Sequence, residues 1–188
     1  MIRVSVFNDM SLCTAQEVSR MLPLVSAQRR DQALKFKFVQ GQFACLKSYL
    51  MLSEMTGLKM FDFTYDEYGK PSVAGHPEIM FSLSHCRNAI AVAVNDSPIG
   101  IDVESFRKAD DALLRRTMNE EEIRMVEASD CRERAFASLW TKKEAVFKLL
   151  GTGITDDIRT VLSENGDIST WTSVDDTLKY VISTAVYL

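Results

Sequence analysis

Asp102 and Glu104 are residues whose types and spacing suggest chemistry. They lie in the fragment Ile-Gly-Ile-Asp-Val-Glu at 99–104, where apolar residues occupy every second position, which is the pattern of a strand. That period places both carboxylates on one face of the strand, where like charges repel each other. One explanation is an edge strand with a solvated face. The other is a cation bound between these two carboxylates and a third acidic group.

Glu144 is the candidate for the third carboxylate. In the fragment Trp140-Thr-Lys-Lys-Glu-Ala-Val-Phe-Lys148, Trp140, Glu144 and Lys148 recur at every fourth position and share one stripe of a predicted helix. Glu144 and Lys148 alone are explained as a solvent-exposed ion pair, but a tryptophan on the same stripe favours a partly buried face. Three carboxylates in one place would suit a hard cation such as Mg²⁺, and a lysine one turn beyond predicts a site that handles phosphates.

The composition narrows the class of protein. The formal net charge of −4 over 188 residues argues against non-specific nucleic-acid binding. The sequence has neither an apolar run of the roughly 18 residues that span a membrane nor the apolar region of a signal peptide. Its four cysteines are widely scattered, which predicts reduced thiols in a cytoplasmic protein and no zinc site.

Two further segments could bind a ligand. A basic cluster could bind an anion, with a solvated helix face as the alternative; it consists of Arg29, Arg30, Lys35 and Lys37. The fragment Phe81-Ser-Leu-Ser-His85 ends a predicted strand and places His85 where the chain must turn. A lone histidine is more often a structural hydrogen-bonding residue than a functional one. Without a Gly-x-Ser-x-Gly elbow, a serine-hydrolase triad is poorly supported.

The periodicity predicts an α+β fold in which the order strand, helices, strands occurs twice. The predicted strands and extended segments cover 2–7, 60–65, 79–83, 89–94 and 99–104, and the predicted helices cover about 14–22, 26–36, 38–55, 110–117, 119–128 and 131–150. We expect strands 89–94 and 99–104 to form a hairpin across the turn at 95–98. The remainder, from about Asp157, predicts strands joined by a turn at Asn165-Gly166.

The division between the two repeats falls near Ser97-Pro98. We therefore expect two α+β halves, residues 1–97 and 98–188, packed against each other. The absence of a segment rich in Pro, Gly and Ser between them argues against independently moving domains.

Four fragments taken together resemble a known family. They are Tyr68-Gly-Lys-Pro71, Phe81-Ser-Leu-Ser-His85, Ile99-Gly-Ile-Asp-Val-Glu104 and Trp140-Thr-Lys-Lys-Glu-Ala-Val-Phe-Lys148. Each is a weak motif alone, but the four in this order are highly specific, and they resemble the 4′-phosphopantetheinyl transferases. The similarity is to the monomeric type with two halves, typified by the activator of surfactin synthetase, and it covers residues 68–148.

The resemblance implies a fold of two pseudo-symmetric α+β halves with the active site in the cleft between them. The implied reaction is transfer of the phosphopantetheine arm of coenzyme A to a serine of an acyl or peptidyl carrier protein, with release of 3′,5′-ADP. Asp102, Glu104 and Glu144 look like the Mg²⁺ ligands, and Lys148 would steady the pyrophosphate, with Lys143 beside it in the motif. The serine proton could pass to Glu144 or to a metal-bound water.

The resemblance also implies which residues meet the nucleotide of coenzyme A. Ser84 and His85 would contact the 3′-phosphate, and Gly69, Lys70 and Pro71 would line the adenine and ribose. Arg29 corresponds to a basic residue of the family that binds a phosphate of coenzyme A. This last assignment implies that the basic cluster binds a phosphate of coenzyme A.

Other residues have weaker assignments. Glu122 is a further acidic candidate, although the start of a helix explains its acidic neighbourhood adequately. Carrier proteins are acidic, so the segment 105–125 could steer them with its basic residues, or those residues could be solvated helix charges; they are Arg107, Lys108, Arg115 and Arg116. The rival functions are a catalytically silent module that binds coenzyme A or a carrier protein, and another metal-dependent phosphohydrolase.

Overall fold

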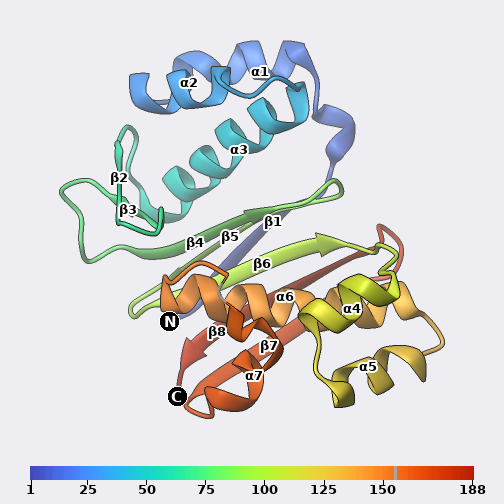
Figure 1. Ribbon diagram of the computed structural model, residues 1–188. Coiled ribbons are helices and arrows are strands. Elements are labelled where there is room, and N and C mark those ends of the chain that lie inside the picture. Colours follow the sequence, from blue (N-terminus) through green and yellow to red (C-terminus); the bar gives the residue numbers. More distant parts are fainter. Residues whose placement is uncertain (155) are drawn as a thin grey trace.

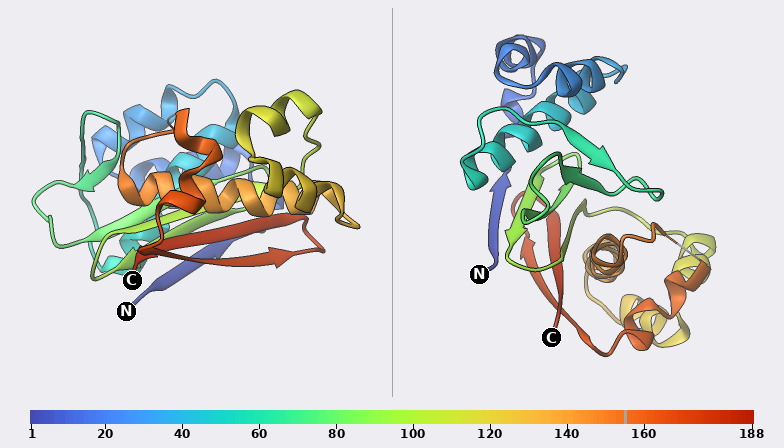
Figure 2. Two further views of the ribbon diagram at one scale, coloured as in Figure 1. Left: turned by 60° about the horizontal axis from the view of Figure 1, so that its bottom comes forward. Right: turned by 90° about the vertical axis from the view of Figure 1, so that its left-hand side faces the viewer.

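The computed structural model describes residues 1–154 and 156–188 and has the expected α+β fold. Helices lie on the outer sides of two small sheets that meet in the middle of the molecule (Figures 1 and 2). The elements up to residue 97 are β1 (Arg3–Phe7), η1 (Met10–Leu12), α1 (Ala15–Met21), η2 (Leu22–Leu24), α2 (Ala27–Leu34), α3 (Val39–Thr56), β2 (Phe63–Tyr65), β3 (Pro71–Val73), β4 (Met80–His85) and β5 (Ile90–Asn95). The elements beyond it are β6 (Ile99–Ser105), α4 (Asp111–Thr117), α5 (Glu120–Glu127), α6 (Arg132–Leu150), η3 (Asp156–Arg159), α7 (Val161–Glu164), β7 (Ile168–Asp175) and β8 (Tyr180–Tyr187). In the part of the chain that the structure describes, no helix is long and apolar enough to cross a membrane.

The two three-stranded sheets have the same topology. Their strand orders are β1-β5-β4 and β6-β8-β7, so in each sheet the last strand in sequence lies between the other two. Each sheet is packed against one long helix, α3 or α6, and each of these helices ends at a glycine in the left-handed conformation, Gly57 (φ 78°) or Gly151 (φ 77°). On this repeated order we propose the division into an N-terminal half, residues 1–97, and a C-terminal half, residues 98–188.

The predicted hairpin of 89–94 with 99–104 is wrong. β5 is the central strand of its sheet, and both of its edges are occupied by β1 and β4. β6 instead pairs with β8, from Ile99 opposite Val186 to Ser105 opposite Tyr180. The turn at 95–98 therefore carries the chain from one sheet to the other. A local turn pattern cannot predict this, because it does not indicate which edges are already taken.

The predicted hairpin turn at Asn165-Gly166 is also wrong. Asn165 follows the short helix α7 and its Nδ2 donates to the carbonyl of Val161 at 2.8 Å. The hairpin of β7 and β8 turns over residues 176–179, where a carboxylate oxygen of Asp175 accepts from the backbone N–H groups of Thr177 and Leu178 at 3.0 and 2.8 Å. The side chain of Asp175 therefore stabilises the hairpin turn, and the predicted Asn-Gly turn does not connect the strands.

Serine hydroxyls join the two sheets where β4 lies beside β6. Ser82 Oγ accepts from the backbone N–H of Ile101 at 3.0 Å, and Ser84 Oγ accepts from that of Val103 at 3.2 Å. Both serines are buried. They thereby pair N–H groups of β6 that would otherwise be buried without a partner.

Gly100 allows α6 to lie directly on β6. A Cβ at this position would overlap the carbonyl oxygen of Ala145 and would be 2.7 Å from the backbone nitrogen of Leu149. Only glycine permits such a close approach of helix to strand. As a result, the polar face of β6 and the inner stripe of α6 share one side of the molecule, which sets up the site described next.

Candidate active site

Three adjoining cavities line the junction of the two sheets. The loop cavity, about 290 Å³, lies between residues 68–71 and the end of α6. The acidic cavity, about 370 Å³, lies over the end of β6, and the basic cavity, about 130 Å³, lies against α2 and α3. Leu83 lines all three, Glu144 and Lys148 line the first two, and Ser84 and His85 line the last two. The three cavities therefore adjoin one another along β4, and we refer to them together as the cleft.

The acidic cavity contains the three predicted carboxylates, Asp102, Glu104 and Glu144. Asp102 is buried, and its Oδ1 accepts hydrogen bonds from Lys148 Nζ and Ser84 Oγ, both at 2.7 Å. Ser84 thus has two roles, since the same hydroxyl accepts from the backbone of β6 and donates to Asp102. The carboxylates predicted from the strand alternation and from the helical stripe therefore line the same cavity.

Glu104 is held by its own neighbours. Its Oε1 accepts from the backbone N–H of Ser105 at 2.9 Å, and its Oε2 is 3.8 Å from Nε of Arg107. Burial raises the pKa of Glu104, and Arg107 opposes this effect. The guanidinium of Arg107 lies over the rings of Trp140 and Phe136, with 5.1 and 5.4 Å between its central carbon and the ring centroids.

Glu144 has a pKa raised to about 7. Burial is the main cause and the charge of Asp102 adds to it, while Lys148 lowers the pKa and Glu104 raises it further. A buried carboxyl group beside other carboxylates gives up its proton less readily. Glu144 can therefore exchange a proton near neutral pH.

The residues of the acidic cavity fit a hard divalent cation. Within residues 1–154 and 156–188, no three His, Cys, Asp or Glu side chains are arranged so that they could hold a metal ion as they stand. The donors are nevertheless all carboxylates, and the charge of Asp102 raises the pKa of both Glu104 and Glu144. A cation would relieve this repulsion, and the ammonium of Lys148 on Asp102 already does so in part.

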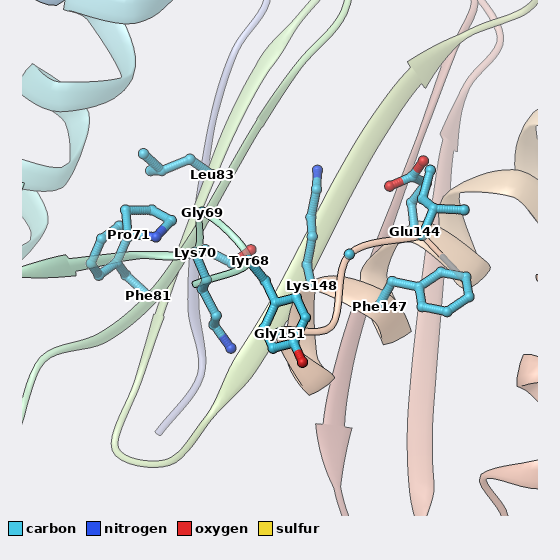
Figure 3. Close-up of a pocket in the computed structure, with 13 residues that line it drawn as sticks. Tyr68, Gly69, Lys70, Pro71, Phe81, Leu83, Glu144, Phe147, Lys148 and Gly151 are labelled. Carbon is cyan, nitrogen blue, oxygen red and sulfur yellow. The ribbon is translucent and has the colours of Figure 1, made fainter. Parts of the chain in front are cut away.

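The loop cavity has apolar walls (Figure 3). Glu144, Phe147 and Lys148 of α6 lie on one side of the cavity, and the loop at 68–71 and the side chains of Phe81 and Leu83 in β4 lie on the other. Its apolar lining comes from Tyr68, Pro71, Phe81, Leu83, Phe147 and Ile154. Such walls suit a flat ring system.

Lys70 fastens the loop to α6. Its Nζ donates to the carbonyl of Leu149 at 2.9 Å, at the end of the helix where carbonyl groups carry partial negative charge. Asp66 Oδ1 shapes the turn by accepting from the N–H groups of Tyr68 and Lys70 at 3.0 and 2.8 Å, and Gly69 has a φ of 83°. Burial lowers the pKa of Lys70. The predicted nucleotide residues Gly69, Lys70 and Pro71 therefore lie together in the loop cavity.

The basic cavity contains Arg29 beside Ser84 and His85. Arg29 is buried, its Nε donates to the carbonyl of Cys45 at 2.9 Å, and its Nη2 donates to Ser48 Oγ at 3.1 Å. His85 reaches the surface, yet the surrounding protein and the positive charges of Lys148 and Arg29 lower its pKa. This cavity has the charge that an anion needs.

Lys143 does not reach the cleft, and this corrects its assignment as a residue that binds coenzyme A. Its side chain is fully buried, and Nζ donates to Glu122 Oε2 at 2.7 Å and to the carbonyl of Ile158 at 2.6 Å. Because one residue advances a helix by about 100°, Lys143 points toward α5 while Glu144 points into the cleft. Glu122 also accepts from the backbone N–H of Asn119, so it is a structural residue.

Sequence reasoning missed several residues that line the cleft. Arg107, which the sequence suggested as a residue that steers the carrier protein or as a solvated helix charge, lines the acidic cavity. Gly151, Gly153 and Ile154 line the loop cavity. Two glycines after a helix that carries Glu144 indicate a turn of the chain beside the site, and this pattern could have identified the segment.

Comparisons with known proteins agree with the family resemblance of the four sequence fragments. A family model described as the 4′-phosphopantetheinyl transferase superfamily matches residues 98–181. The chain is 31% identical over 162 residues to the 4′-phosphopantetheinyl transferase psf-1 of Bacillus pumilus, a match covering 80% of this chain and 70% of that protein. It is 28% identical to a 4′-phosphopantetheinyl transferase of Bacillus subtilis, covering 87% and 78% of the two chains. It is 26% identical to 4′-phosphopantetheinyl transferase Sfp of Bacillus subtilis (strain 168), covering 82% and 74%.

Proposed function

The chain belongs to the 4′-phosphopantetheinyl transferase superfamily and is of the Sfp type, and from this premise we propose a Mg²⁺-dependent transfer from coenzyme A to a carrier protein. The transferred group is 4′-phosphopantetheine, the acceptor is a serine of an acyl or peptidyl carrier protein, and the leaving group is 3′,5′-ADP. The observation that supports this most is the convergence of Asp102, Glu104, Glu144 and Lys148 in a cleft that also includes an apolar and a basic cavity.

The cleft suggests how coenzyme A would lie. The apolar walls of the loop cavity would take the adenine, and Arg29 and His85 in the basic cavity would take the 3′-phosphate. Lys148 and Glu144 line both the loop cavity and the acidic cavity. They would therefore lie beside the pyrophosphate.

The reaction is an in-line displacement at phosphorus. The serine oxygen forms a bond to the β-phosphorus of coenzyme A, the bond from that phosphorus to the bridging oxygen breaks, and the bridging oxygen leaves with 3′,5′-ADP. Positioning and charge neutralisation do most of the work in such transfers. Lys148 would stabilise the negative charge on the pyrophosphate, and the carboxylate of Glu144 would accept the serine proton.

Asp102, Glu104 and Glu144 would hold Mg²⁺, which neutralises pyrophosphate oxygens when bound. The rival binding module predicts that carboxylates or Lys148 are missing, yet all four are present and face the cleft. The rival phosphohydrolase keeps these residues and differs in its acceptor, which would be water.

One incubation separates the three functions. The protein is mixed with coenzyme A, Mg²⁺ and an apo carrier protein, and the carrier is weighed by mass spectrometry. A gain of one phosphopantetheine that needs Mg²⁺ supports the proposal. Coenzyme A binding without a mass gain would favour the silent module, and release of 3′,5′-ADP without a mass gain would favour the hydrolase.

A further inference from the structure

Lys148 neutralises one oxygen of Asp102, which is a proposed metal ligand. Its Nζ lies 2.7 Å from Oδ1 of Asp102, and the same oxygen accepts from Ser84. The Asp102 side chain is 9% exposed, whereas that of Lys148 is 30% exposed and lines both the acidic and the loop cavity. A flexible four-carbon stem with a point charge at its end can move between these cavities without unpacking the core.

Arg107 provides a contrast in the same cavity. Its Nε is 3.8 Å from Glu104, and its guanidinium is held over the ring of Trp140. The Arg107 side chain is 41% exposed, so its attraction to Glu104 is screened by solvent. Of these two basic side chains, Lys148 makes the closer contact with a carboxylate, and that carboxylate is the more buried one.

We propose that Lys148 is an exchangeable counter-ion, which neutralises Asp102 until a divalent cation replaces it and then moves to the pyrophosphate of coenzyme A. This inference rests on the proposed function, because the pyrophosphate is the second partner of Lys148. In the exchange, the divalent cation replaces Lys148 as the partner of Asp102, and the pyrophosphate replaces Asp102 as the partner of Lys148. No buried charge is left without a partner, which would be costly.

The exchange couples the two ligands. The cation alone would leave Lys148 without an anion, and coenzyme A alone would draw Lys148 away and leave Asp102 without a cation. Each ligand therefore binds more tightly when the other is present, and the two increases in affinity must be equal. We expect this factor to be on the order of tenfold, within the usual range of such couplings.

The test uses Mn²⁺ as the probe and measures its binding by isothermal titration calorimetry and electron paramagnetic resonance, with and without coenzyme A. Binding of Mn²⁺ by coenzyme A in solution is measured separately and subtracted. In Lys148→Met, which keeps the length of the side chain, Mn²⁺ should bind about tenfold more tightly than to the wild type when coenzyme A is absent. The gain from coenzyme A should shrink by the same factor. Lys148→Arg, which keeps the charge and the donor, should behave like the wild type.

Arg107→Met is the control for charge alone. It removes a positive charge from the same cavity without removing a close contact to a carboxylate, so its Mn²⁺ affinity should change by less than about threefold. Equal tightening in Arg107→Met and Lys148→Met, or no tightening in Lys148→Met, would overturn the exchange. Thermal unfolding of each variant checks the fold, and Lys148→Gln replaces Lys148→Met if the latter does not fold.

Crystal structures give a second readout. The Nζ–Oδ1 distance should stay near 3 Å in the protein alone and lengthen beyond about 4 Å with Mn²⁺ and coenzyme A bound, past the limit of a hydrogen bond. If the wild type modifies carriers and binds Mn²⁺ while Lys148 stays on Asp102, the exchange is wrong and the transferase function stands. If the wild type modifies no carrier and coenzyme A does not affect Mn²⁺ binding, the proposed function fails, and the inference fails with it.

Discussion

The two halves of the molecule have one topology and different chemistry. Counting back from the closing glycines Gly57 and Gly151, the seventh position is Leu50 in α3 and Glu144 in α6. Leu50 packs against the hydrophobic core of its half, whereas Glu144 lines the cleft. The two helices therefore provide equivalent positions with different surroundings. The position in α3 faces a hydrophobic core, and the position in α6 faces the cleft.

The first strands of the two halves differ in the same way. β1 is an outer edge strand, and its Val4 and Val6 are exposed. The N–H groups of β6 instead meet the serine hydroxyls of β4. Asp102 and Glu104, which we propose as metal ligands, thus lie on the strand that faces the other half. The family model matches this half, residues 98–181, which contains all three carboxylates and Lys148.

The largest effect on activity should come from replacing Glu144, the residue seven positions before Gly151. Glu144→Gln should lower the rate of carrier modification by at least about 100-fold, because it removes a charge and a proton acceptor at the reacting phosphate. Its midpoint of thermal unfolding should stay within a few degrees of the wild type, since one of three mutually repelling carboxylates is lost. Mass spectrometry of the carrier measures the rate.

Leu50→Gln is the matched change in α3. It should cost about 1–2 kcal/mol of stability through lost burial and leave the rate per folded molecule nearly unchanged. Near-normal activity in Glu144→Gln, or a similar loss of rate in both variants, would contradict the contrast between the halves.

The residues eight positions before Gly57 and Gly151 are Tyr49 and Lys143, and they have similar surroundings in the two halves. Both Tyr49 and Lys143 are fully buried, and the polar tip of each bonds to a neighbouring segment: Tyr49 Oη to the backbone of Phe61, and Lys143 Nζ to Ile158 in η3 and Glu122 in α5. Lys143→Met should cost about 3–5 kcal/mol, because it leaves the buried charge of Glu122 without its cation. Urea unfolding measures this loss.

Combining Lys143→Met with Glu122→Gln should recover most of that stability, since no buried charge then remains. Tyr49→Phe should cost about 2 kcal/mol, because it removes the two hydrogen bonds between Tyr49 Oη and the backbone of Phe61. A large loss of activity per folded molecule in the double variant would show that Lys143 acts in the cleft after all.

Gly100→Ala tests the contact that brings α6 onto β6. The new methyl group would overlap the backbone of α6, so we expect about 3 kcal/mol of destabilisation and a reduced rate, because the stripe with Glu144 is pushed away. The control is Gly166→Ala, where a Cβ would meet no atom within 4 Å. Equal unfolding midpoints in urea for the two variants would contradict the predicted close approach.

The smallest effects should come from replacing Ser82 or Ser84, the two serines at the junction of β4 and β6. Ser82→Ala and Ser84→Ala should each cost about 1–2 kcal/mol, because each leaves a buried N–H of β6 without its acceptor. Only Ser84→Ala should also weaken Mn²⁺ binding, since only Ser84 donates to Asp102. Equal Mn²⁺ affinities in the two variants would argue against a positioning role for Ser84.

Local patterns in the sequence predicted most of the elements and the site, and they failed where the outcome depended on distant partners. The alternation at 99–104 and the stripe in 140–148 depend only on local geometry, so they correctly placed Asp102, Glu104, Glu144 and Lys148 in one cavity. The hairpin of β5 with β6 failed because the pairing of β5 with β1 is set by residues more than 80 positions apart.

Lys143 shows a second limit. Being next to Glu144 in a motif suggests a shared function, but adjacent residues on a helix face different directions. Only the position of α5 reveals that Lys143 meets a buried glutamate. The bond from Lys70 to Leu149 was also unpredictable, because it joins a loop to a helix 79 residues further along the chain.

The serine-bonded junction has a consequence for how the molecule would open. Within each sheet, backbone pairs hold the strands, whereas at β4 and β6 two hydroxyl groups accept the amide protons of Ile101 and Val103. Separation of the sheets at this point would break those two bonds and leave the backbone pairing within each sheet intact. In hydrogen–deuterium exchange, these amides would act as local sensors of such breathing. A ligand that bridges the cleft should slow their exchange before it slows that of the central strands.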